Sequence, residues 1–394
     1  MKQVDLELKT LFYEMLEGVE DLAREYETTR IDLEKLKLKV QWSVGIFKGY
    51  QIFDYGEYSY EIDGELPDPD LVVTFNDLGM AKKLFKDELR DYRIMADGSK
   101  FRIHFYEIEE NMNIIEPKVP YKDFKYDVEL QFSGPMEQRK LYFLSRIPAF
   151  NKMFVKHYDP EHSTGTPIPI NVSLGTYENQ IIPMVVLEHF FKKASLMYLV
   201  DCGCRLGNEC KDYDARLGCM YLGKGVTKLD LTLPWRIEKH GHLASYDEAM
   251  AQARKAIESG LVPVMGRYRA EAAMMYALPD EGDMLTICYC CPCCCIQGGV
   301  KHRSSAVRKI FKRMEGVNVQ VDEELCVGCE DCLEVCIYDG INITEGKAQV
   351  NQETCLGCGR CERVCQNDAI TINIDDYNQI DDLIARIESY VNVT

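Results

Sequence analysis

The spacing of the cysteines near the C-terminus is the feature that most constrains this chain. The pattern C-x2-C-x2-C-x3-C occurs twice, with the two runs offset by 29 residues. The runs contain Cys326, Cys329, Cys332 and Cys336, and then Cys355, Cys358, Cys361 and Cys365. An x2 spacing lets one tight turn present three thiolates to a cluster of iron and sulfide. Zinc is the alternative, but zinc sites usually combine paired C-x2-C half-sites. The spacing therefore predicts iron–sulfur ligation.

The residues around the two runs also match each other. VDEELCVGCEDCLEVC at 321–336 aligns with VNQETCLGCGRCERVC at 350–365. Gly328 and Gly357 occupy the same loop position, where a Cβ would obstruct the approach of the backbone to a cluster. We expect short β-strands at 317–321, 341–343 and 369–374. Residues 317–375 thus resemble the bacterial-type ferredoxin domain that holds two [4Fe–4S] clusters.

The resemblance implies which cysteines share a cluster, because the last cysteine of each run in such domains ligates the other cluster. One cluster is then assigned to Cys326, Cys329, Cys332 and Cys365, and the other to Cys355, Cys358, Cys361 and Cys336. The family usually has proline after the fourth cysteine, whereas this chain has Ile337 and Gln366. Each replacement restores a backbone N–H near a cluster, which predicts reduction potentials that differ from the family default.

The other ten cysteines fall into two groups nearer the middle of the chain. They are Cys202, Cys204, Cys210 and Cys219, and then Cys288, Cys290, Cys291, Cys293, Cys294 and Cys295. Each group follows a hydrophobic stretch, 196–200 or 284–287, so both are expected in loops that leave buried strands. Four cysteines separated by short polar gaps can surround a cubane. The first group therefore predicts a third iron–sulfur cluster, with zinc as the alternative.

The run CYCCPCCC at 288–295 allows several interpretations. Neighbouring side chains of an extended chain point to opposite sides, so six thiols cannot all ligate one cubane without a turn. Pro292 supplies a bend. A fourth cluster, a larger non-cubane cluster and ligands that complete the site of the first group all stay open. Reactive thiols that bind a substrate are a further alternative.

A second resemblance extends over residues 165–375. Here Cys202-Gly203-Cys204-Arg205 and the run at 288–295 precede the ferredoxin-like segment. The arrangement resembles a group of ferredoxin-like proteins of anaerobes, in which a C-x-C-R motif and a CxCCxCCC run precede a two-cluster ferredoxin. The resemblance implies an anaerobic iron–sulfur protein and brings no settled activity with it.

Periodicity and composition predict an α+β multidomain chain. Residues 1–118 combine a helical stripe with alternating strands, which predicts a helix-plus-sheet domain. Its acidic and aromatic strands at 55–77, with a PDP turn, LVVTF and a following helix, resemble the sterol-carrier-protein-like fold and imply a groove for an apolar ligand. We expect a cysteine-rich α/β middle domain at 121–316, the dicluster ferredoxin domain at 317–375 and an amphipathic C-terminal helix at 376–394.

Charge narrows the possible partners. The 394 residues carry a formal net charge of −18, so nucleic acid is not an expected partner, because no basic surplus neutralises phosphates. Residues 317–375 contain twelve acidic side chains but only Lys347, Arg360 and Arg363 as basic ones. This excess predicts a redox protein with a basic docking patch as the partner.

Composition also indicates where the protein works. The longest apolar stretch, 181–191, is too short for a membrane span. Eighteen cysteines in a chain that starts without secretory-signal features indicate a reducing, anaerobic cytoplasm. The C-terminal helix leaves association into a homo-oligomer open.

The predicted function is the transfer of low-potential electrons between a redox partner and the cysteine-rich central site. One alternative is an oxidoreductase that reduces a small molecule at a cluster or thiolate site in the middle domain. Another is a module that senses redox state or an apolar ligand. The sequence contains no G-x-G-x-x-G fingerprint, so a hydride donor would have to be bound by another chain.

Overall fold

The computed structural model divides the chain into two compact units. The structure describes residues 5–75, 77–88, 101–105, 121–124, 142–170, 176–177, 180–229, 241–274, 277 and 279–394. The first unit contains 1–133, 137–158 and 302–308, and the second contains 134–136, 159–301 and 309–394. The expected domain boundary after residue 118 lies outside the described residues. Residues 142–158 and 302–308, which we expected in the middle domain, pack with the N-terminal unit.

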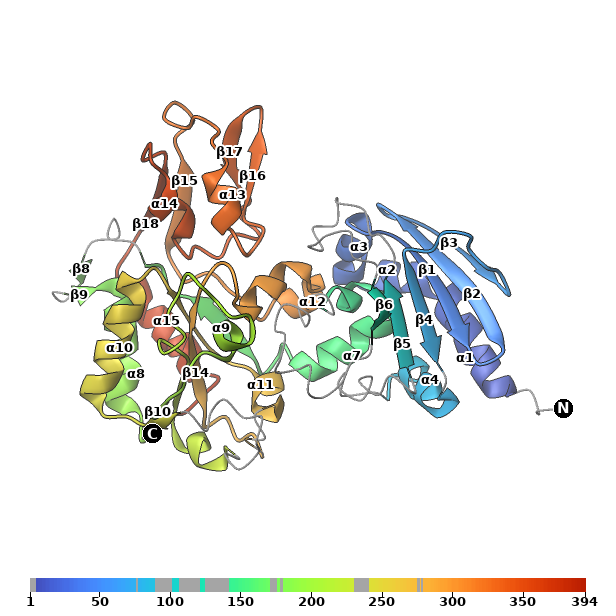
Figure 1. Ribbon diagram of the computed structural model, residues 1–394, viewed down its shortest axis with the longest axis horizontal. Helices are drawn as coiled ribbons and strands as arrows, with labels where there is room; N and C mark the ends of the chain where they lie inside the picture. The colour runs from blue at the N-terminus through green and yellow to red at the C-terminus, as the bar shows by residue number, and fades with distance from the viewer. Residues whose placement is uncertain are drawn as a thin grey trace. The chain divides into compact units, whose positions relative to one another are not determined.

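The first unit combines one mixed sheet with several helices (Figure 1). The strand order is β3 (Glu57–Ile62), β2 (Phe47–Asp54), β1 (Lys37–Val44), β4 (Leu71–Phe75), β5 (Phe101–Phe105) and β6 (Tyr121–Phe124). β1 and β4 run parallel, and the other neighbours run antiparallel. The helices are α1 (Leu6–Glu17), α2 (Val19–Glu25), α3 (Glu27–Glu34), α4 (Leu78–Phe85), η3 (Tyr142–Arg146), α7 (Pro148–Tyr158) and α12 (Ser305–Arg308).

Local sequence explains how this unit forms its core. The Asp5 carboxylate caps α1 by accepting the N–H of Leu8 at 3.1 Å. Phe12 and Leu16, four residues apart on α1, are fully buried. Alternate residues of β1 are buried, and among them Trp42 stacks on Phe150 of α7 with ring centroids 5.6 Å apart. Helical and strand periodicity thus direct apolar side chains into one core.

A cavity in this unit lies along β1, β2, β4 and the loop that precedes β4. Its lining includes Lys48, Glu65 and Asp68 as well as Leu66 and Val72. The lining is therefore mixed in polarity, unlike the apolar groove that we expected. An apolar ligand for this unit stays a prediction.

Residues 302–308 are attached to the first unit by a buried carboxylate and a stacked guanidinium. Asp32 accepts hydrogen bonds from the backbone N–H of Ser305 at 2.8 Å and from its hydroxyl at 2.7 Å. Arg303 lies over the rings of Tyr142 and Tyr158, 4.3 and 4.5 Å from their centroids. Burial raises the pKa of Asp32, although Ser305 opposes the shift. These contacts return the chain to its N-terminal unit before the ferredoxin-like segment begins.

The second unit contains a six-stranded sheet covered by helices. The strand order is β12 (His242–Leu243), β10 (Met197–Leu199), β11 (Met220–Leu222), β14 (Leu285–Cys290), β13 (Val262–Arg267) and β7 (Thr164–Pro167). All of these neighbours pair antiparallel, so this region is an antiparallel α+β layer instead of the α/β domain that we expected. The remaining elements are β8 (Thr176–Tyr177), β9 (Gln180–Ile181), α8 (Ile182–Lys193), α9 (Gly203–Gly207), η5 (Lys224–Lys228), α10 (Tyr246–Glu258), α11 (Arg269–Met274), η7 (Ile296–His302) and α15 (Gln379–Glu388).

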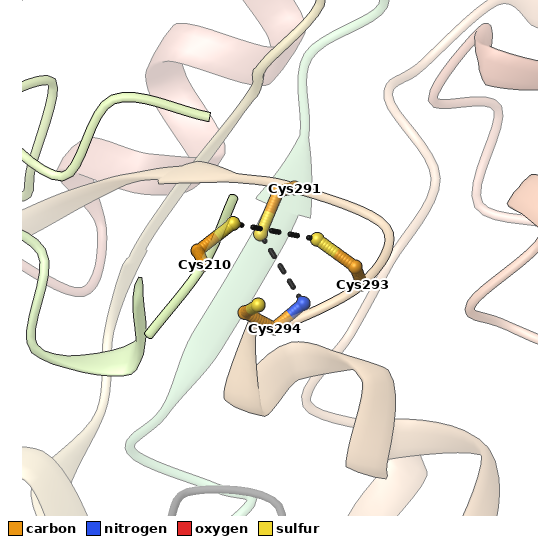
Figure 2. A group of neighbouring side chains, drawn as sticks. All are labelled: Cys210, Cys291, Cys293 and Cys294. Carbon is orange, nitrogen blue, oxygen red and sulfur yellow. Dashed lines mark hydrogen bonds between the residues drawn. The ribbon is translucent and has the colours of Figure 1, made fainter. Parts of the chain in front are cut away.

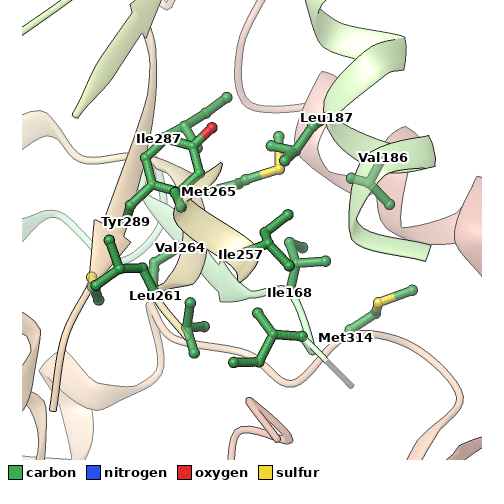
Figure 3. Packing of buried hydrophobic residues seen from close by; sticks show 14 of the residues in the cluster. Ile168, Val186, Leu187, Ile257, Leu261, Val264, Met265, Ile287, Tyr289 and Met314 are labelled. Carbon is green, nitrogen blue, oxygen red and sulfur yellow. The ribbon is translucent and has the colours of Figure 1, made fainter. Parts of the chain in front are cut away.

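Figure 3 shows the apolar core of this unit, where Leu187 of α8, Ile257 of α10 and Met265 of β13 pack together. The C-terminal helix α15 belongs to the same core and buries Ile380, Leu383 and Ile387. The amphipathic stripe of α15 therefore completes the core of its own chain.

The ferredoxin-like segment adds two small strand pairs and two one-turn helices to this unit. β15 (Val317–Val321) pairs with β18 (Ile370–Ile374), and β16 (Ile341–Thr344) pairs with β17 (Lys347–Val350). The helices are α13 (Asp331–Val335) and α14 (Arg360–Val364). Buried residues of the segment and of the six-stranded sheet form one continuous core. Among the helices that the structure describes, none has the length and apolarity needed to cross a bilayer.

Candidate metal centres

The two C-terminal cysteine runs fold in the same way. In each run a tight loop leads into a one-turn helix that carries the third cysteine, Cys332 in α13 and Cys361 in α14. Gly328 and Gly357 adopt φ values of 70° and 65°, which other residues seldom tolerate. A Cβ on Gly328 would lie 2.2 Å from the carbonyl oxygen of Gly346. Both glycines are thus required by the loop geometry.

The last cysteine of each run lies with the first three of the other run. A small cavity is lined by Cys326, Cys329, Cys332 and Cys365. In the other half of the segment, burial raises the pKa of Cys361, and the thiols of Cys358, Cys355 and Cys336 add to that effect. The two resulting groups of four have the composition that the ferredoxin resemblance implies.

Backbone N–H groups are directed at several of these sulfurs. Gly340 donates to the Sγ of Cys336 at 3.2 Å, and Ala369 donates to the Sγ of Cys365 at 3.3 Å. Each donor lies four residues after its cysteine, whereas we expected the added N–H directly after the cysteine, at the position that is proline in the family. The effect on the reduction potentials stays a prediction.

The two loops differ in exposure although their spacing is identical. Val327 in the first loop is 65% exposed, whereas the aligned Leu356 in the second loop is 8% exposed. Cys329 is exposed, and its counterpart Cys358 is only partly accessible. The first cysteine loop therefore lies at the protein surface, and the second is covered.

Charge also distinguishes the two runs. Asp331 and Glu334 of the first run align with Arg360 and Arg363 of the second. Arg360 donates from Nη2 to the carbonyl oxygen of Cys290 at 2.7 Å, and Arg363 donates to the carbonyl oxygen of Glu258 at 3.0 Å. Arg360 thus attaches the second run to the CYCCPCCC segment, and Arg363 attaches it to the end of α10. We did not single out Arg360 from the sequence, although the replacement of an acid by arginine between aligned repeats was the available signal.

Four of the ten other cysteines form a tight group. They are Cys210, Cys291, Cys293 and Cys294, whose sulfur atoms all lie within 4.8 Å of one another (Figure 2). Cys210 comes from the loop after α9, and the other three come from the turn after β14. The Sγ atoms of Cys210 and Cys293 are 3.7 Å apart. The structure thus separates Cys210 from the three cysteines with which we had grouped it.

The other six cysteines form a continuous series of thiol contacts. Cys219 and Cys288 approach to 3.5 Å between sulfurs, and Cys290 and Cys295 to 2.9 Å. The thiol of Cys204 interacts with those of Cys202 and Cys295, and Cys290 also interacts with Cys288. We call Cys202, Cys204, Cys219, Cys288, Cys290 and Cys295 the six-cysteine set. Three of its members come from each of the two sequence groups, so the expected four-cysteine site is replaced by a shared one.

Neighbouring thiols shift the pKa values in this set in opposite directions. The hydrogen bond from Cys204 lowers the pKa of Cys202 to about 7, and the adjacent Arg205 guanidinium acts in the same direction. Cys219 and Cys290, together with burial, raise the pKa of Cys288 well above its usual range. As free thiols, several members of the set would therefore be neutral at pH 7.

The charge balance around two buried arginines indicates whether these cysteines fit a bound metal. Arg205 and Arg360 are 1% and 4% exposed, and within the described ranges neither forms an ion pair with Asp or Glu. The Nε atoms of both lack a hydrogen-bond partner there. The strongest favourable electrostatic interactions of both are with cysteines, Cys202 for Arg205 and Cys358 for Arg360.

A buried cation without a countercharge is costly. Metal ligation deprotonates cysteine, so bound thiolates would supply the missing negative charge. The surroundings of both arginines therefore fit metal-bound thiolates better than neutral thiols.

Comparison with known proteins identifies the C-terminal region. The family model described as 4Fe-4S binding domain matches residues 348–371, which include the second cysteine run. This region is ferredoxin-like and is assigned at least one [4Fe–4S] cluster. Neither the curated proteins nor the solved structures gave a significant match.

Proposed function

We propose that the protein transfers electrons between a redox partner and its cysteine-rich centre through a series of iron–sulfur clusters. The observation that carries this proposal is the position of Arg360. Its guanidinium binds the carbonyl oxygen of Cys290 and interacts electrostatically with the thiols of Cys358 and Cys290. One buried side chain thus links the second ferredoxin cluster site to the six-cysteine set.

In this proposal the C-terminal segment holds two [4Fe–4S] clusters and the six-cysteine set holds a third, central iron–sulfur cluster. Cluster one has the ligands Cys326, Cys329, Cys332 and Cys365, and cluster two has the ligands Cys355, Cys358, Cys361 and Cys336. The cavity formed by both runs and the N–H donors to sulfur support the first part. The buried cation Arg205, which interacts with Cys202 and Cys219, supports the second. When bound, each cluster supplies one-electron chemistry.

The exposed first run is the proposed entry for electrons. Leu325 and Val327 are 48% and 65% exposed beside the cluster loop. All three basic side chains of residues 317–375 donate to backbone carbonyls, Lys347 to Cys326 at 2.6 Å and the two arginines as described above. Lys347 is thus the one basic side chain of residues 317–375 beside the first loop, and the acidic residues there stay in excess. A partner with a basic patch around an apolar centre matches this surface.

Single-ligand variants of the two runs test the order of the clusters. The full chain, purified without oxygen, is mixed with reduced methyl viologen, and cluster reduction is followed by rapid-freeze EPR. In Cys358→Ser we expect cluster one to be reduced at the wild-type rate, while the central signal no longer develops on the wild-type time scale. Cys329→Ser is the matched variant at the proposed entry, and there we expect reduction of cluster two and of the centre to slow together. Unchanged central reduction in Cys358→Ser would contradict the proposed route.

A second candidate function is the reduction of a small molecule at the centre. The six-cysteine set contains two more thiols than a cubane needs, and this surplus favours chemistry at the site. Cyanide added to the oxidised protein tests it. An altered EPR spectrum of the central cluster would indicate an iron that is open to external ligands, and an unchanged spectrum would favour electron transfer alone.

A further inference from the structure

The spacing of the sulfur atoms separates one group of cysteines from all the others. The four sulfurs of Cys210, Cys291, Cys293 and Cys294 lie within 4.8 Å of one another. Within the described ranges no other group of three or more Cys, His, Asp or Glu ligands meets this limit, and those ranges include the eight ferredoxin cysteines and the six-cysteine set. A cubane holds its cysteine sulfurs outside four iron atoms and therefore needs them further apart.

The observed spacing fits one metal ion. A metal–sulfur distance of about 2.3 Å places the sulfurs of a regular tetrahedron about 3.8 Å apart. The sulfurs of Cys210 and Cys293 are 3.7 Å apart. We propose that Cys210, Cys291, Cys293 and Cys294 bind a single tetrahedral metal ion, zinc or iron, that is separate from the iron–sulfur clusters.

The surroundings of the four sulfurs support this assignment. The N–H of Cys294 donates to the Sγ of Cys291 at 3.3 Å (Figure 2), and the N–H groups of Asp212 and Tyr213 interact with Cys210. Such donors orient thiolate ligands and offset their charge. Arg205 also interacts electrostatically with Cys291. Four thiolates around a divalent ion leave two negative charges, which this buried guanidinium partly neutralises.

The ion would hold together the two segments that build the six-cysteine set. Cys210 belongs to the segment that supplies Cys202, Cys204 and Cys219, and the other three ligands belong to the segment that supplies Cys288, Cys290 and Cys295. Asn208 already joins the segments, because its side-chain amide donates to the carbonyl oxygens of Cys204 at 2.7 Å and Cys294 at 3.4 Å. A tetrahedral ion next to this bridge would fix the distance between the two halves of the central site.

Four thiolate ligands fill a tetrahedral site and leave no position for a substrate, which is typical of structural metal ions. Three of the six cysteines in the CYCCPCCC run, Cys291, Cys293 and Cys294, would then be ligands of a structural ion. Only Cys288, Cys290 and Cys295 of that run would take part in the redox chemistry of the centre.

Metal and sulfide analysis of Cys210→Ser tests the proposal. The full chain is purified without oxygen, and zinc, iron and acid-labile sulfide are measured per chain. We expect the variant to lose one metal ion while its sulfide stays at the wild-type value. Cys219→Ser is the matched control, because its thiol belongs to the six-cysteine set, and we expect it to lose iron and sulfide together.

The metal that Cys210→Ser loses identifies the ion as zinc or as iron. Loss of sulfide along with iron in this variant would overturn the proposal, because Cys210 would then ligate a cluster. Unchanged metal content would overturn it equally. The ferredoxin EPR signals report the state of the clusters separately, so failure of this proposal is distinguishable from failure of the proposed electron route.

A spectroscopic measurement on the wild-type protein covers the case in which Cys210→Ser does not fold. For bound zinc we expect X-ray absorption to find four sulfur neighbours at about 2.3 Å and no iron neighbour. For bound iron we expect Mössbauer spectra to contain a high-spin component from one four-sulfur iron in addition to the clusters. Absence of both signatures would overturn the proposal.

Discussion

The two C-terminal runs share one ligand spacing but differ in nearly everything that surrounds it. The first run has an exposed loop and acidic residues on its helix, whereas the second has a covered loop and two arginines at the aligned positions. Arg360 donates to the backbone carbonyl of Cys290, and Arg363 donates to that of Glu258 at the end of α10. The repeated cysteines therefore give both runs the same ligand spacing, and the residues between them set which loop is exposed and which is covered.

This difference gives the proposed electron route a direction. A surface-exposed cluster exchanges electrons with a docked protein, and a covered cluster exchanges them within the chain. Leu356 and Arg360 close the second loop against its own protein, while Val327 and Glu334 leave the first loop accessible. Variants at these positions test whether the two loops differ in burial and in charge as described.

The largest effect is expected from alanine at the two aligned apolar positions. Leu356→Ala should destabilise the fold by about 2–4 kcal/mol, because it removes a buried side chain and leaves a cavity. Val327→Ala should change stability by less than about 0.5 kcal/mol, because Val327 is already largely exposed. Anaerobic urea denaturation followed by circular dichroism and cluster absorbance measures both. Equal losses in the two variants would contradict the difference in burial.

The next effect is a shift of reduction potential in Arg360→Gln. Loss of a buried positive charge disfavours an added electron, so the potentials of cluster two and of the central cluster should fall, by on the order of 100 mV. Arg360→Lys keeps the charge and should keep most of the potential. EPR-monitored redox titration measures these values. An unchanged potential in Arg360→Gln would mean that this guanidinium does not act on the clusters.

A smaller effect is expected at the acidic helix of the first run. Replacing Asp331 and Glu334 by Asn and Gln should slow reduction by the methyl viologen cation about two- to fivefold at low ionic strength. The difference should vanish at high salt, because ions screen exposed charges. Arg363→Gln serves as the control, since its guanidinium is occupied by the carbonyl oxygen of Glu258. Stopped-flow absorbance at several salt concentrations gives the rates, and a rate independent of the acids would remove the proposed docking face.

The fold of the ferredoxin-like segment could be predicted from sequence because the residues that determine it are close together in the chain. The expected strands at 317–321, 341–343 and 369–374 correspond to β15, β16 and β18. Its ligand spacing and loop glycines lie within a few residues of one another, so no distant contact has to be known.

The grouping of the central cysteines could not be predicted from sequence, because it depends on contacts between residues far apart in the chain. β11 pairs antiparallel with β14 so that Met220 faces Ile287, and this register brings Cys219 to Cys288 across 69 residues of chain. Local spacing carries no information about such a pairing. The tight group around Cys210 depends in the same way on how the loop after α9 meets the turn after β14.

Residues 301–316 show how local periodicity alone can mislead, because Val307, Ile310, Phe311 and Met314 form an apolar stripe at helical spacing among basic side chains. Only Ser305–Arg308 is α-helical, and the 3-10 helix η7 ends at His302. Ser305 is held by Asp32 of the first unit, and Ile310 and Lys312 instead form backbone hydrogen bonds with Gly165 at 2.9 Å each. Tertiary contacts on both sides thus override the helical pattern.

Iron and acid-labile sulfide per chain, measured on the anaerobically purified protein together with EPR after dithionite reduction, test the central claim most directly. Three cubanes predict about twelve iron and twelve sulfide, with one further zinc or iron ion that brings no sulfide. The account also predicts that about four iron and four sulfide persist when the ligands of the C-terminal segment are removed. About eight iron and eight sulfide, with only the signals of a two-cluster ferredoxin, would contradict a cluster in the centre and end the proposed route there.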